Sequence, residues 1–244
     1  MDRFYIPPDA WNDEDLVLRG EEAHHCARVM RKVVGDELEV FNGEGHWSRG
    51  EVVSLSKEEV HIKARESGLS APLVPAITLG QALPKGKTME LIVQKAVELG
   101  VSEIVPLLTS HTVVRLDTAE GARKREKWQR IALEACKQCG QNHLPQVALP
   151  QQIGTWLDER ASADLSVVAS LAGDARLLRE VLREVPARPA TATVLVGPEG
   201  DFSSDEEKAA REAGFAPAAL GDIVLRVETA TLHVLGCLRY EFGD

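Results

Sequence analysis

The segment that decides the fold is Val194-Leu195-Val196-Gly197-Pro198-Glu199-Gly200-Asp201-Phe202-Ser203-Ser204-Asp205-Glu206-Glu207, in which an apolar strand passes through a Gly-Pro-Glu-Gly turn into a helix. Ser203 with Glu206, and Ser204 with Glu207, both have the spacing of a capping box at a helix start. In parallel sheets, ligands bind beyond the carboxyl ends of the strands, where glycines let backbone amides approach. The segment is therefore either a ligand-binding loop or a plain strand–helix connection. It matches neither the dinucleotide fingerprint nor the P-loop.

Strands and helices alternate on both sides of this segment. Gly100, Gly140 and Gly214 each follow a helical pattern, as glycine commonly does where a helix ends. Such alternation predicts an α/β domain with a parallel sheet. The expected strands span 77–81, 104–107, 165–170 and 193–196, and the expected helices span 88–99, 123–139, 176–184, 203–213 and 227–242.

The first 70 residues have a different pattern, with short strands at close spacing and a single helix over 21–32. The Asn42-Gly43-Glu44-Gly45 segment is typical of a hairpin connection, because glycine and asparagine accept positive φ. This pattern predicts a small β-barrel, and the Ser, Gly and Pro content of 66–75 predicts a linker. We therefore expect two domains, over 1–70 and 71–244. The expected strands of the first domain are 3–6, 16–18, 38–41, 46–53 and 60–65.

The composition is that of an ordinary globular protein. Hydrophobic residues make up 44% and charged residues 27% of the 244-residue chain, which excludes a disordered tail or a collagen-like fibre. Four cysteines do not form a disulfide framework in this length, and they favour a reducing compartment. No run approaches the ~18 apolar residues of a membrane span, and the N-terminus lacks the pattern of a signal peptide. We expect a soluble, cytoplasmic protein with no membrane partner.

The charge of the whole chain argues against a nucleic-acid partner, but the distribution of charge does not. The formal net charge is −10, from 28 Lys and Arg against 38 Asp and Glu. Phosphate binding requires a basic surface, and the stretch 115–137 carries seven basic residues against four acidic ones. On the first predicted helix, Arg28, Arg31 and Lys32 have the spacing of a phosphate-facing stripe. Charge alone favours the other interpretation, solvated helix faces of both signs.

A second motif opens the C-terminal helix, where a glycine turn and an apolar run lead into Arg226-Val227-Glu228-Thr229-Ala230. An arginine held at a cleft can neutralise a developing anion, whereas Glu228 in a first helical turn also fits ordinary complementation of the helix dipole. Cys136, Cys139 and His143 have partial metal-ligand spacing, but a zinc site requires a fourth ligand. We interpret these three residues as inert and expect no metal.

These residues together make the chain similar to the bacterial 16S rRNA uridine-N3 methyltransferases, the RsmE family of SPOUT-class enzymes. The resemblance covers nearly the whole length, and its specificity lies in several motifs that occur in the same order and spacing. The motifs are Arg3-Phe4-Tyr5, His24-His25, Arg28-Val29-Met30-Arg31, Gly35-Asp36, Phe41-Asn42-Gly43, Lys87-x-x-Glu90, Gln94-Lys95, Glu98-Leu99-Gly100-Val101, Pro106, Trp128-Gln129-Arg130-Ile131-Ala132, Glu134-Ala135-Cys136-Lys137-Gln138, Gly197-Pro198-Glu199-Gly200, Leu220-Gly221 and Leu225-Arg226-Val227-Glu228-Thr229-Ala230.

The resemblance implies a PUA-like N-terminal β-barrel that binds RNA and a C-terminal SPOUT α/β domain with a deep trefoil knot. It implies a homodimer that uses S-adenosylmethionine (SAM) to methylate N3 of a specific uridine in the decoding region of 16S rRNA, within the 30S subunit. The implied knot loops are 171–173, 197–200 and 220–225. The implied SAM-binding residues are Leu171, Ala172, Gly173, Val196, Gly197, Pro198, Glu199, Gly200, Leu220, Gly221, Ile223, Leu225, Thr229 and Ala230. The implied RNA-binding residues are Arg3, His25, Arg28, Arg31, Lys32, Lys87, Arg115, Lys127 and Arg130.

The implied reaction defines what the catalytic residues must do. Uridine N3 carries a proton at neutral pH, so the site must remove that proton or stabilise the anion spread over O2 and O4. Arg226 is the candidate for stabilising the anion, and Glu199 or Glu228 is the candidate for accepting the proton. An ordinary carboxylate is a weak base, so burial would have to raise its pKa. Glu199 equally fits a role in bonding the substrate or a backbone amide.

Three positions depart from the family pattern. Asp201 replaces the second glycine of Gly-Pro-Glu-Gly-Gly, Gln141 stands in place of an arginine, and Val227 replaces a threonine. Asp201 adds a charge near the expected cofactor loop, and Gln141 removes one. Two alternatives therefore stay open: a SPOUT methyltransferase acting on a ribose 2′-hydroxyl or another base, and a non-catalytic RNA-binding relative. Gly197, Glu199, Arg226 and Glu228 are all retained, and they favour the uridine-N3 methyltransferase.

Overall fold

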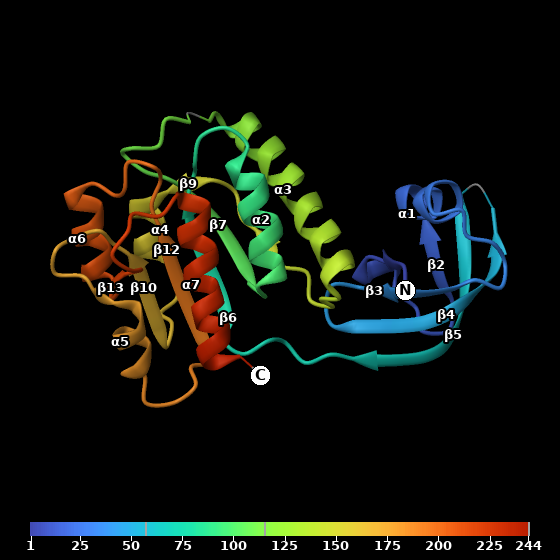
Figure 1. The fold of residues 1–244 in the computed structure, drawn as a ribbon. Coiled ribbons are helices and arrows are strands. Elements are labelled where there is room, and N and C mark those ends of the chain that lie inside the picture. The colour runs from blue at the N-terminus through green and yellow to red at the C-terminus, as the bar shows by residue number, and fades with distance from the viewer. Residues whose placement is uncertain (57, 115, 244) are drawn as a thin grey trace. The chain divides into compact units, whose positions relative to one another are not determined.

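The computed structural model describes residues 1–56, 58–114 and 116–243, and the chain forms two compact units. Unit 1 comprises Met1–Pro72 and Cys136–Leu144, and unit 2 comprises Leu73–Ala135 and Pro145–Asp244. Each unit has its own sheet (Figure 1). Each also has its own apolar core. Within the described ranges, none of the helices combines the length and the apolar composition needed to cross a bilayer.

Unit 1 is an open, curled β-sheet. Its strands are β1 (Arg3–Tyr5), β2 (Leu16–Arg19), β3 (Glu37–Phe41), β4 (His46–Leu55) and β5 (Glu59–Leu69). They lie in the order β1-β3-β4-β5-β2, with β1 and β3 parallel and the other neighbours antiparallel. Alternation along the strands places Leu38, Val40, Val52 and Ile62 in one core. The predicted small β-unit is confirmed, as a half-barrel with β1 and β2 at its edges.

The predicted helix over 21–32 is only partly correct. A short 3₁₀ turn, η1 (Pro8–Ala10), precedes β2, and α1 (Gly20–His24) then continues as a π-helical turn, η2 (His25–Val29). Arg31 follows with a left-handed backbone, at φ 56°. A π-turn holds an extra residue, which hydrophobic periodicity does not reveal. The widened turn leaves Cys26 buried in the core.

The linker predicted over 66–75 begins later than expected, because β5 runs on to Leu69. Residues 66–69 pair with 46–49 of β4. Gly68 does not break the strand, since a Cβ at this position would lie 2.9 Å from the indole of Trp47. The glycine therefore makes room for the ring and does not mark a loop.

Unit 2 is an α/β domain with a wholly parallel sheet, as predicted. Its strands are β6 (Ala76–Ala82), β7 (Glu103–Leu108), β8 (Gln146–Val147), β9 (Gln151–Gln152), β10 (Leu165–Ala169), β11 (Arg176–Leu177), β12 (Thr191–Val196) and β13 (Ala216–Ala219). The order is β11-β13-β10-β12-β6-β7-β8, and β9 also pairs with β7. All these pairings are parallel. The carboxyl ends of β10, β12 and β13 therefore meet at one edge of the sheet.

Helices cover both faces of this sheet. They are α2 (Thr88–Glu98), α3 (Thr118–Cys139), α4 (Ile153–Glu159), α5 (Leu178–Arg183), α6 (Ser204–Glu212) and α7 (Val227–Phe242). On one face, Trp156 of α4 and Ala210 of α6 pack with Leu107 and Leu195 of the sheet. Helices α2 and α7 pack against each other, with α7 lying over β12 (Figure 1). The helix predicted over 227–242 is confirmed, whereas α3 begins earlier than predicted.

Several elements are not predicted by the sequence. Strand β13 is Ala216-Pro217-Ala218-Ala219, which has low strand propensity but pairs between β10 and β11. Strands β8, β9 and β11 have 2 residues each, too few for a periodic pattern. Helix α4 has 7 residues and begins with Ile153-Gly154. The trefoil knot stays a prediction.

Candidate functional site

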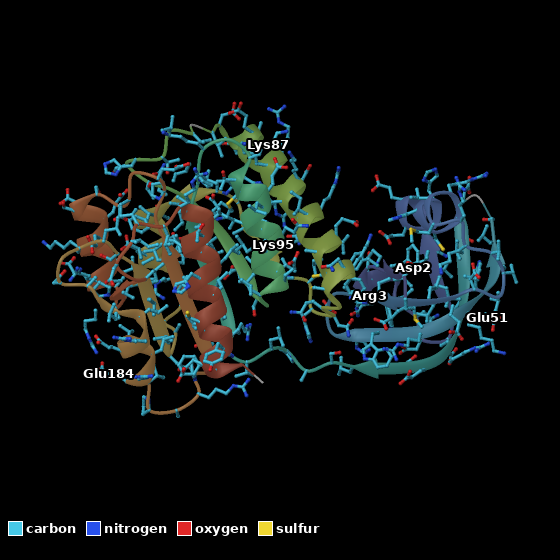
Figure 2. All side chains as sticks on the ribbon, viewed as in Figure 1. Asp2, Arg3, Glu51, Lys87, Lys95 and Glu184 are labelled. Carbon is cyan, nitrogen blue, oxygen red and sulfur yellow. The ribbon has the colours of Figure 1, made fainter. Side chains whose placement is uncertain are left out.

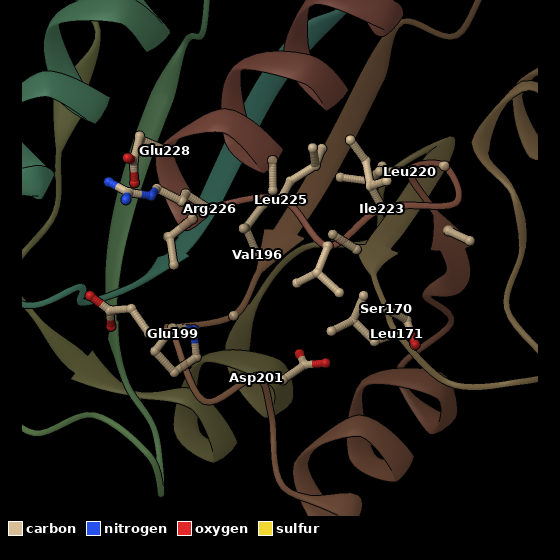
Figure 3. A pocket seen from close by; sticks show the side chains of 18 of the residues that line it. Ser170, Leu171, Val196, Glu199, Asp201, Leu220, Ile223, Leu225, Arg226 and Glu228 are labelled. Atoms are coloured by element: carbon tan, nitrogen blue, oxygen red, sulfur yellow. The ribbon is translucent and has the colours of Figure 1, made fainter.

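A cavity of about 530 Å³ lies at the carboxyl ends of β10, β12 and β13 and reaches the first turn of α7 (Figure 3). Loops that follow the three strands form its walls, which is where a parallel sheet binds ligands. The lining residues are Thr88, Ala169, Ser170, Leu171, Ala172, Val196, Gly197, Pro198, Glu199, Asp201, Ala219, Leu220, Gly221, Ile223, Val224, Leu225, Arg226, Val227, Glu228 and Ala230.

The turn after β12 is held by its own backbone and by the helix that follows. The Asp201 N–H donates to the Pro198 carbonyl at 3.0 Å, and Asp201 has φ 58°. Ser203 caps α6: its Oγ accepts from the Glu206 N–H at 3.3 Å, and Glu206 Oε2 accepts from the Ser203 N–H at 2.9 Å. The Ser203–Glu206 capping box is confirmed, so the turn enters a fixed helix start.

Glu207 has a different role from the capping box predicted for it with Ser204. Its Oε1 accepts from Ser170 Oγ at 2.6 Å and from Arg211 at 3.1 Å. Arg211 also makes a bidentate ion pair with Asp174, at 2.7 and 2.8 Å, which lowers the pKa of that carboxyl. This chain of bonds fixes the loop after β10 to α6.

Two more loops are tied to the Gly-Pro-Glu-Gly turn. Glu199 Oε1 accepts from the Lys85 N–H at 2.9 Å, which anchors the segment before α2. His111 Nδ1 lies 2.9 Å from the Asp201 carbonyl oxygen, in the loop after β7. In the same loop, Ser110 donates from its N–H and its hydroxyl to Glu206 Oε1, at 2.7 and 3.0 Å. One wall of the cavity is thus fixed by side chains of the turn and of α6.

The start of α7 presents Arg226 and Glu228 to the cavity (Figure 3). Arg226 is the N-cap residue of α7, has an extended backbone and makes no side-chain capping bond. Thr231, one turn on, is fully buried, and its hydroxyl donates to Gln81 Oε1 at 2.6 Å. Gln81 in turn donates to the Ala82 carbonyl at 3.0 Å. This buried network holds the start of α7 on β6 and leaves the Arg226 side chain exposed.

The cavity is acidic. Among the lining residues that the structure describes, the carboxylates are Glu199, Asp201 and Glu228, and the one cationic side chain is Arg226. Burial raises the pKa of Asp201, and the charge of Glu207 raises it further. An environment of this sign favours a cationic ligand or a group that donates hydrogen bonds.

Most of the predicted cofactor residues line the cavity, namely Leu171, Ala172, Val196, Gly197, Pro198, Glu199, Leu220, Gly221, Ile223, Leu225 and Ala230. Gly173, Gly200 and Thr229 do not. At Gly200 a Cβ would lie 3.2 Å from His111, so this glycine faces the loop after β7. Thr88, Ser170 and Asp201 line the cavity without having been predicted as site residues. The position of Ser170 directly after β10 is the signal that could have identified it.

Some of the predicted RNA-binding residues of unit 1 are exposed, and others contact neighbouring side chains within the unit. Arg28 and Arg31 are exposed. Lys32 pairs with Asp2 at 2.8 Å, and the His25 ring packs edge-on against Phe4. These contacts leave Arg28 and Arg31 as the more accessible part of the predicted stripe.

Arg3 is placed inside unit 1 (Figure 2). Its side chain is 8% exposed, pairs with Glu39 at 2.7 Å, donates to the Cys136 carbonyl at 2.7 Å and stacks over Phe41. Its guanidinium also bonds to the Asn142 side chain. We therefore leave Arg3 out of the proposed RNA surface, because internal partners occupy its charge.

In unit 2, Lys87 and Arg130 are exposed, and Lys127 pairs with Glu90 at 2.6 Å on the surface. Figure 2 shows Lys87 just before α2. Arg115, also predicted to bind RNA, lies outside the described residues. Lys127 is exposed but paired with Glu90, so we keep Lys87 and Arg130 as the cations of this predicted patch.

The cysteines do not gather into a ligand set. Cys136 is buried, and burial raises the pKa of its thiol to about 12. Cys139 is exposed, while His143 Nε2 lies 2.9 Å from the Ser70 carbonyl oxygen. Within the described part of the chain, no group of His, Cys, Asp and Glu side chains has an arrangement that could hold a metal.

A second, largely apolar cavity of about 840 Å³ lies along α5 and α7. Leu178, Leu182, Leu232 and Tyr240 are among its lining residues. Tyr240 is 90% exposed. Leu220 and Gly221 line both cavities, so the loop after β13 separates them.

Comparison with known proteins agrees with this architecture. Residues 71–239 match the RNA methyltransferase domain family, and residues 18–64 match the RNA methyltransferase PUA domain. The ribosomal RNA small subunit methyltransferase E of Bacillus subtilis is 31% identical over 249 residues, covering 99% of this chain and 97% of that protein.

Two solved structures are similar over the full length. A methyltransferase from Legionella pneumophila in complex with SAM is 32% identical, with a TM-score of 0.88 and coverage of 99% of this chain and 98% of that one. The ribosomal RNA small subunit methyltransferase E of Neisseria gonorrhoeae bound to SAM is 28% identical, with a TM-score of 0.88 and coverage of 100% and 99%. The chain therefore belongs to the RNA methyltransferase family of the small subunit methyltransferase E type, as the sequence motifs predicted.

Proposed function

We propose that the protein is a SAM-dependent methyltransferase that modifies N3 of a uridine in the decoding region of 16S rRNA, within the small ribosomal subunit. The observation that supports this most directly is the cavity that brings the Gly-Pro-Glu-Gly turn together with Arg226 and Glu228. Relatives that align over almost the whole chain carry the name of a small subunit rRNA methyltransferase, and two of the similar structures were crystallised with SAM.

The cavity fits SAM in size and in charge. About 530 Å³ lies within the range of small-molecule sites, and the acidic lining suits a ligand whose sulfonium is cationic. The turn at 197–201 and the loops at 169–172 and 219–225 would hold the cofactor, with backbone groups and apolar side chains around it. When bound, SAM supplies the methyl group that the uridine nitrogen attacks.

Arg226 and Glu228 are proposed to act on the uridine. Both line the cavity at the start of α7, and Arg226 has no capping role there. The Arg226 guanidinium would stabilise the negative charge that develops on O2 and O4 as N3 loses its proton. Glu228 is the better candidate for accepting that proton, because Glu199 already accepts a hydrogen bond from the Lys85 amide. We assign Glu199 to positioning the segment before α2.

RNA binding is proposed to involve both units. Arg28 and Arg31 of the PUA-like domain (1–70), and Lys87 and Arg130 of the SPOUT domain (71–244), are exposed cations. Phosphate contacts from such residues would position the rRNA while the cavity receives the uridine, which must be unpaired or flipped out.

We further propose a cytoplasmic homodimer with a knotted SPOUT domain, on the strength of the family.

Nucleoside analysis tests this function directly. The protein is incubated with small subunits lacking the modification, with and without SAM, and the rRNA is digested and analysed by mass spectrometry. We expect 3-methyluridine that depends on SAM and forms much more slowly with the Arg226→Ala variant. A 2′-O-methylated nucleoside, or a methylated base other than uridine, would replace this proposal by the other SPOUT reactions. Failure to bind SAM in calorimetry would favour a non-catalytic RNA-binding relative.

A further inference from the structure

Asp201 occupies a position whose backbone favours glycine. Its φ of 58° lies in the left-handed region, which Asn and Asp tolerate better than most L-residues but which glycine adopts without cost. A side chain at this position in this chain therefore calls for a reason other than the shape of the turn.

The Asp201 carboxylate faces the cavity. It lies on the wall opposite Arg226 and points toward Leu171 of the neighbouring loop (Figure 3). Its Oδ1 accepts from the Phe202 N–H at 2.8 Å. Hydrogen bonds from the Phe202 and Leu171 amides favour the ionised form, while burial and the charge of Glu207 oppose it and leave the pKa raised. The group is thus a partly desolvated charge beside the space that a ligand would fill.

No Lys or Arg side chain pairs with this carboxylate in the part of the chain that the structure describes. Glu207, whose charge raises the pKa of Asp201, is itself bonded to Ser170 and Arg211. The charge of His111 lowers the pKa of Asp201, but by less than the charge of Glu207 raises it. Glu199 and Glu228 add two further negative groups to the same lining, against Arg226 alone. The cavity therefore has an excess of negative charge that a ligand can compensate.

Methyl transfer changes the charge of the cofactor. SAM carries a sulfonium cation, and loss of its methyl group to the uridine nitrogen leaves the neutral thioether S-adenosylhomocysteine, while the N3 proton leaves to a base. We propose that Asp201 selects between these two states, because its carboxylate favours the sulfonium of SAM over the neutral product. The inference rests on the proposed function and adds a residue that sets the preference for cofactor over product.

Calorimetry with the full-length protein tests the inference. SAM and S-adenosylhomocysteine are titrated into the wild type, Asp201→Asn and Asp201→Gly. Asparagine keeps the size, the tolerance of positive φ and an oxygen for the Phe202 N–H, whereas glycine removes the whole side chain and relieves the backbone. Both variants remove the negative charge, and they differ in side-chain size and in backbone strain. We expect both to lower the preference for SAM by about threefold to tenfold, chiefly through weaker SAM binding.

Asp205→Asn is the matched control, because Asp205 is an exposed carboxylate on α6 that does not line the cavity. It should leave the preference unchanged. Equal loss of affinity for both ligands in Asp201→Asn, or no change in their ratio, would overturn the inference and leave Asp201 a structural residue. Absence of SAM binding to the wild type would instead overturn the proposed function, so the two failures are distinguishable.

Discussion

The role of Arg226 determines whether the start of α7 takes part in catalysis or only stabilises the fold. The residue begins the helix without a side-chain capping bond. We expect Arg226→Ala to lower turnover by about 10²–10³ and to leave SAM affinity nearly unchanged. Single-turnover kinetics with SAM in excess, together with calorimetry, measure the two effects. Arg226→Lys keeps the charge but not the planar fork, so partial recovery would indicate a simple charge effect. A joint loss of SAM affinity and thermal stability would instead assign Arg226 to holding the loop.

Conservative substitutions distinguish the roles of Glu199 and Glu228. Glutamine at 199 can still accept from the Lys85 N–H, so we expect Glu199→Gln to retain most activity and Glu199→Ala to lose more. Glutamine at 228 cannot accept a proton, so Glu228→Gln should lower turnover by about 10²-fold or more. Rate measurements across pH check this, because loss of a base also alters the pH dependence. A large defect in Glu199→Gln with an active Glu228→Gln would exchange the two roles.

The role of a residue could be predicted where it belongs to a sequence motif. It could not be predicted where it depends on contacts between residues that are distant in sequence. The turn at 197–200 and Arg226 follow from motif and strand position. The internal role of Arg3 does not, because its partners Glu39 and Asn142 are distant in sequence and only the fold brings them together. The cavity-facing carboxylate of Asp201 likewise depends on a left-handed backbone that no pattern reveals.

Strand β6 has a position where packing permits only glycine. A Cβ at Gly80 would lie 2.6 Å from the ring of Trp156 on α4 and 3.2 Å from Leu107. We expect Gly80→Ala to destabilise unit 2 by about 1–3 kcal/mol through overpacking, measured by urea denaturation. Gly154→Ala is the control, since this exposed glycine of α4 has open space around it. That change should be neutral or stabilise by up to about 1 kcal/mol. Equal effects of both substitutions would contradict the close packing of α4.

Helices and strands with a clear hydrophobic period were predicted well, and those without one were not. Helix α7 and strand β6 show such a period. Strand β13 has only small residues and a proline, and its pairing is imposed by its neighbours β10 and β11. The π-turn η2 adds a residue that breaks the period of α1. The local sequence thus determines an element where its side chains repeat with a clear period. Where they do not, as in β13, the neighbouring strands of the sheet determine it.

The acidic chain is expected to bind rRNA through local patches of positive charge. Reversing Arg28 and Arg31 to Glu should weaken binding to small subunits and make the negative slope of log affinity against log salt shallower by about 1.5. SAM affinity should stay unchanged. The double variant Arg19→Glu with Lys63→Glu is the control, because it makes the same change of net charge on exposed residues of the same unit. Equal loss in both variants would show that only total charge matters.

The apolar cavity along α5 and α7 is expected to be the surface on which two copies of the chain associate. Its lining carries Leu182, Leu232 and Tyr240, together with the opposite charges of Arg183 and Glu241. A surface with apolar residues and charges of both signs can pair with itself about a two-fold axis. Ile223 is 75% exposed in the loop after β13, which separates the two cavities, and it adds apolar area that water would otherwise cover.

Gly236 provides the test of this dimer, because it lines the apolar cavity and has open space around its Cα. Gly236→Arg should place a long cation where the partner would pack, without a clash inside the protomer. Sedimentation at micromolar concentration is expected to give about twice the 26.6 kDa chain mass for the wild type and the single mass for the variant. Gly154→Arg, an equally unobstructed change on α4, should leave the dimer intact. A wild type that stays monomeric would contradict the dimer, and a dimeric Gly236→Arg would move the interface elsewhere.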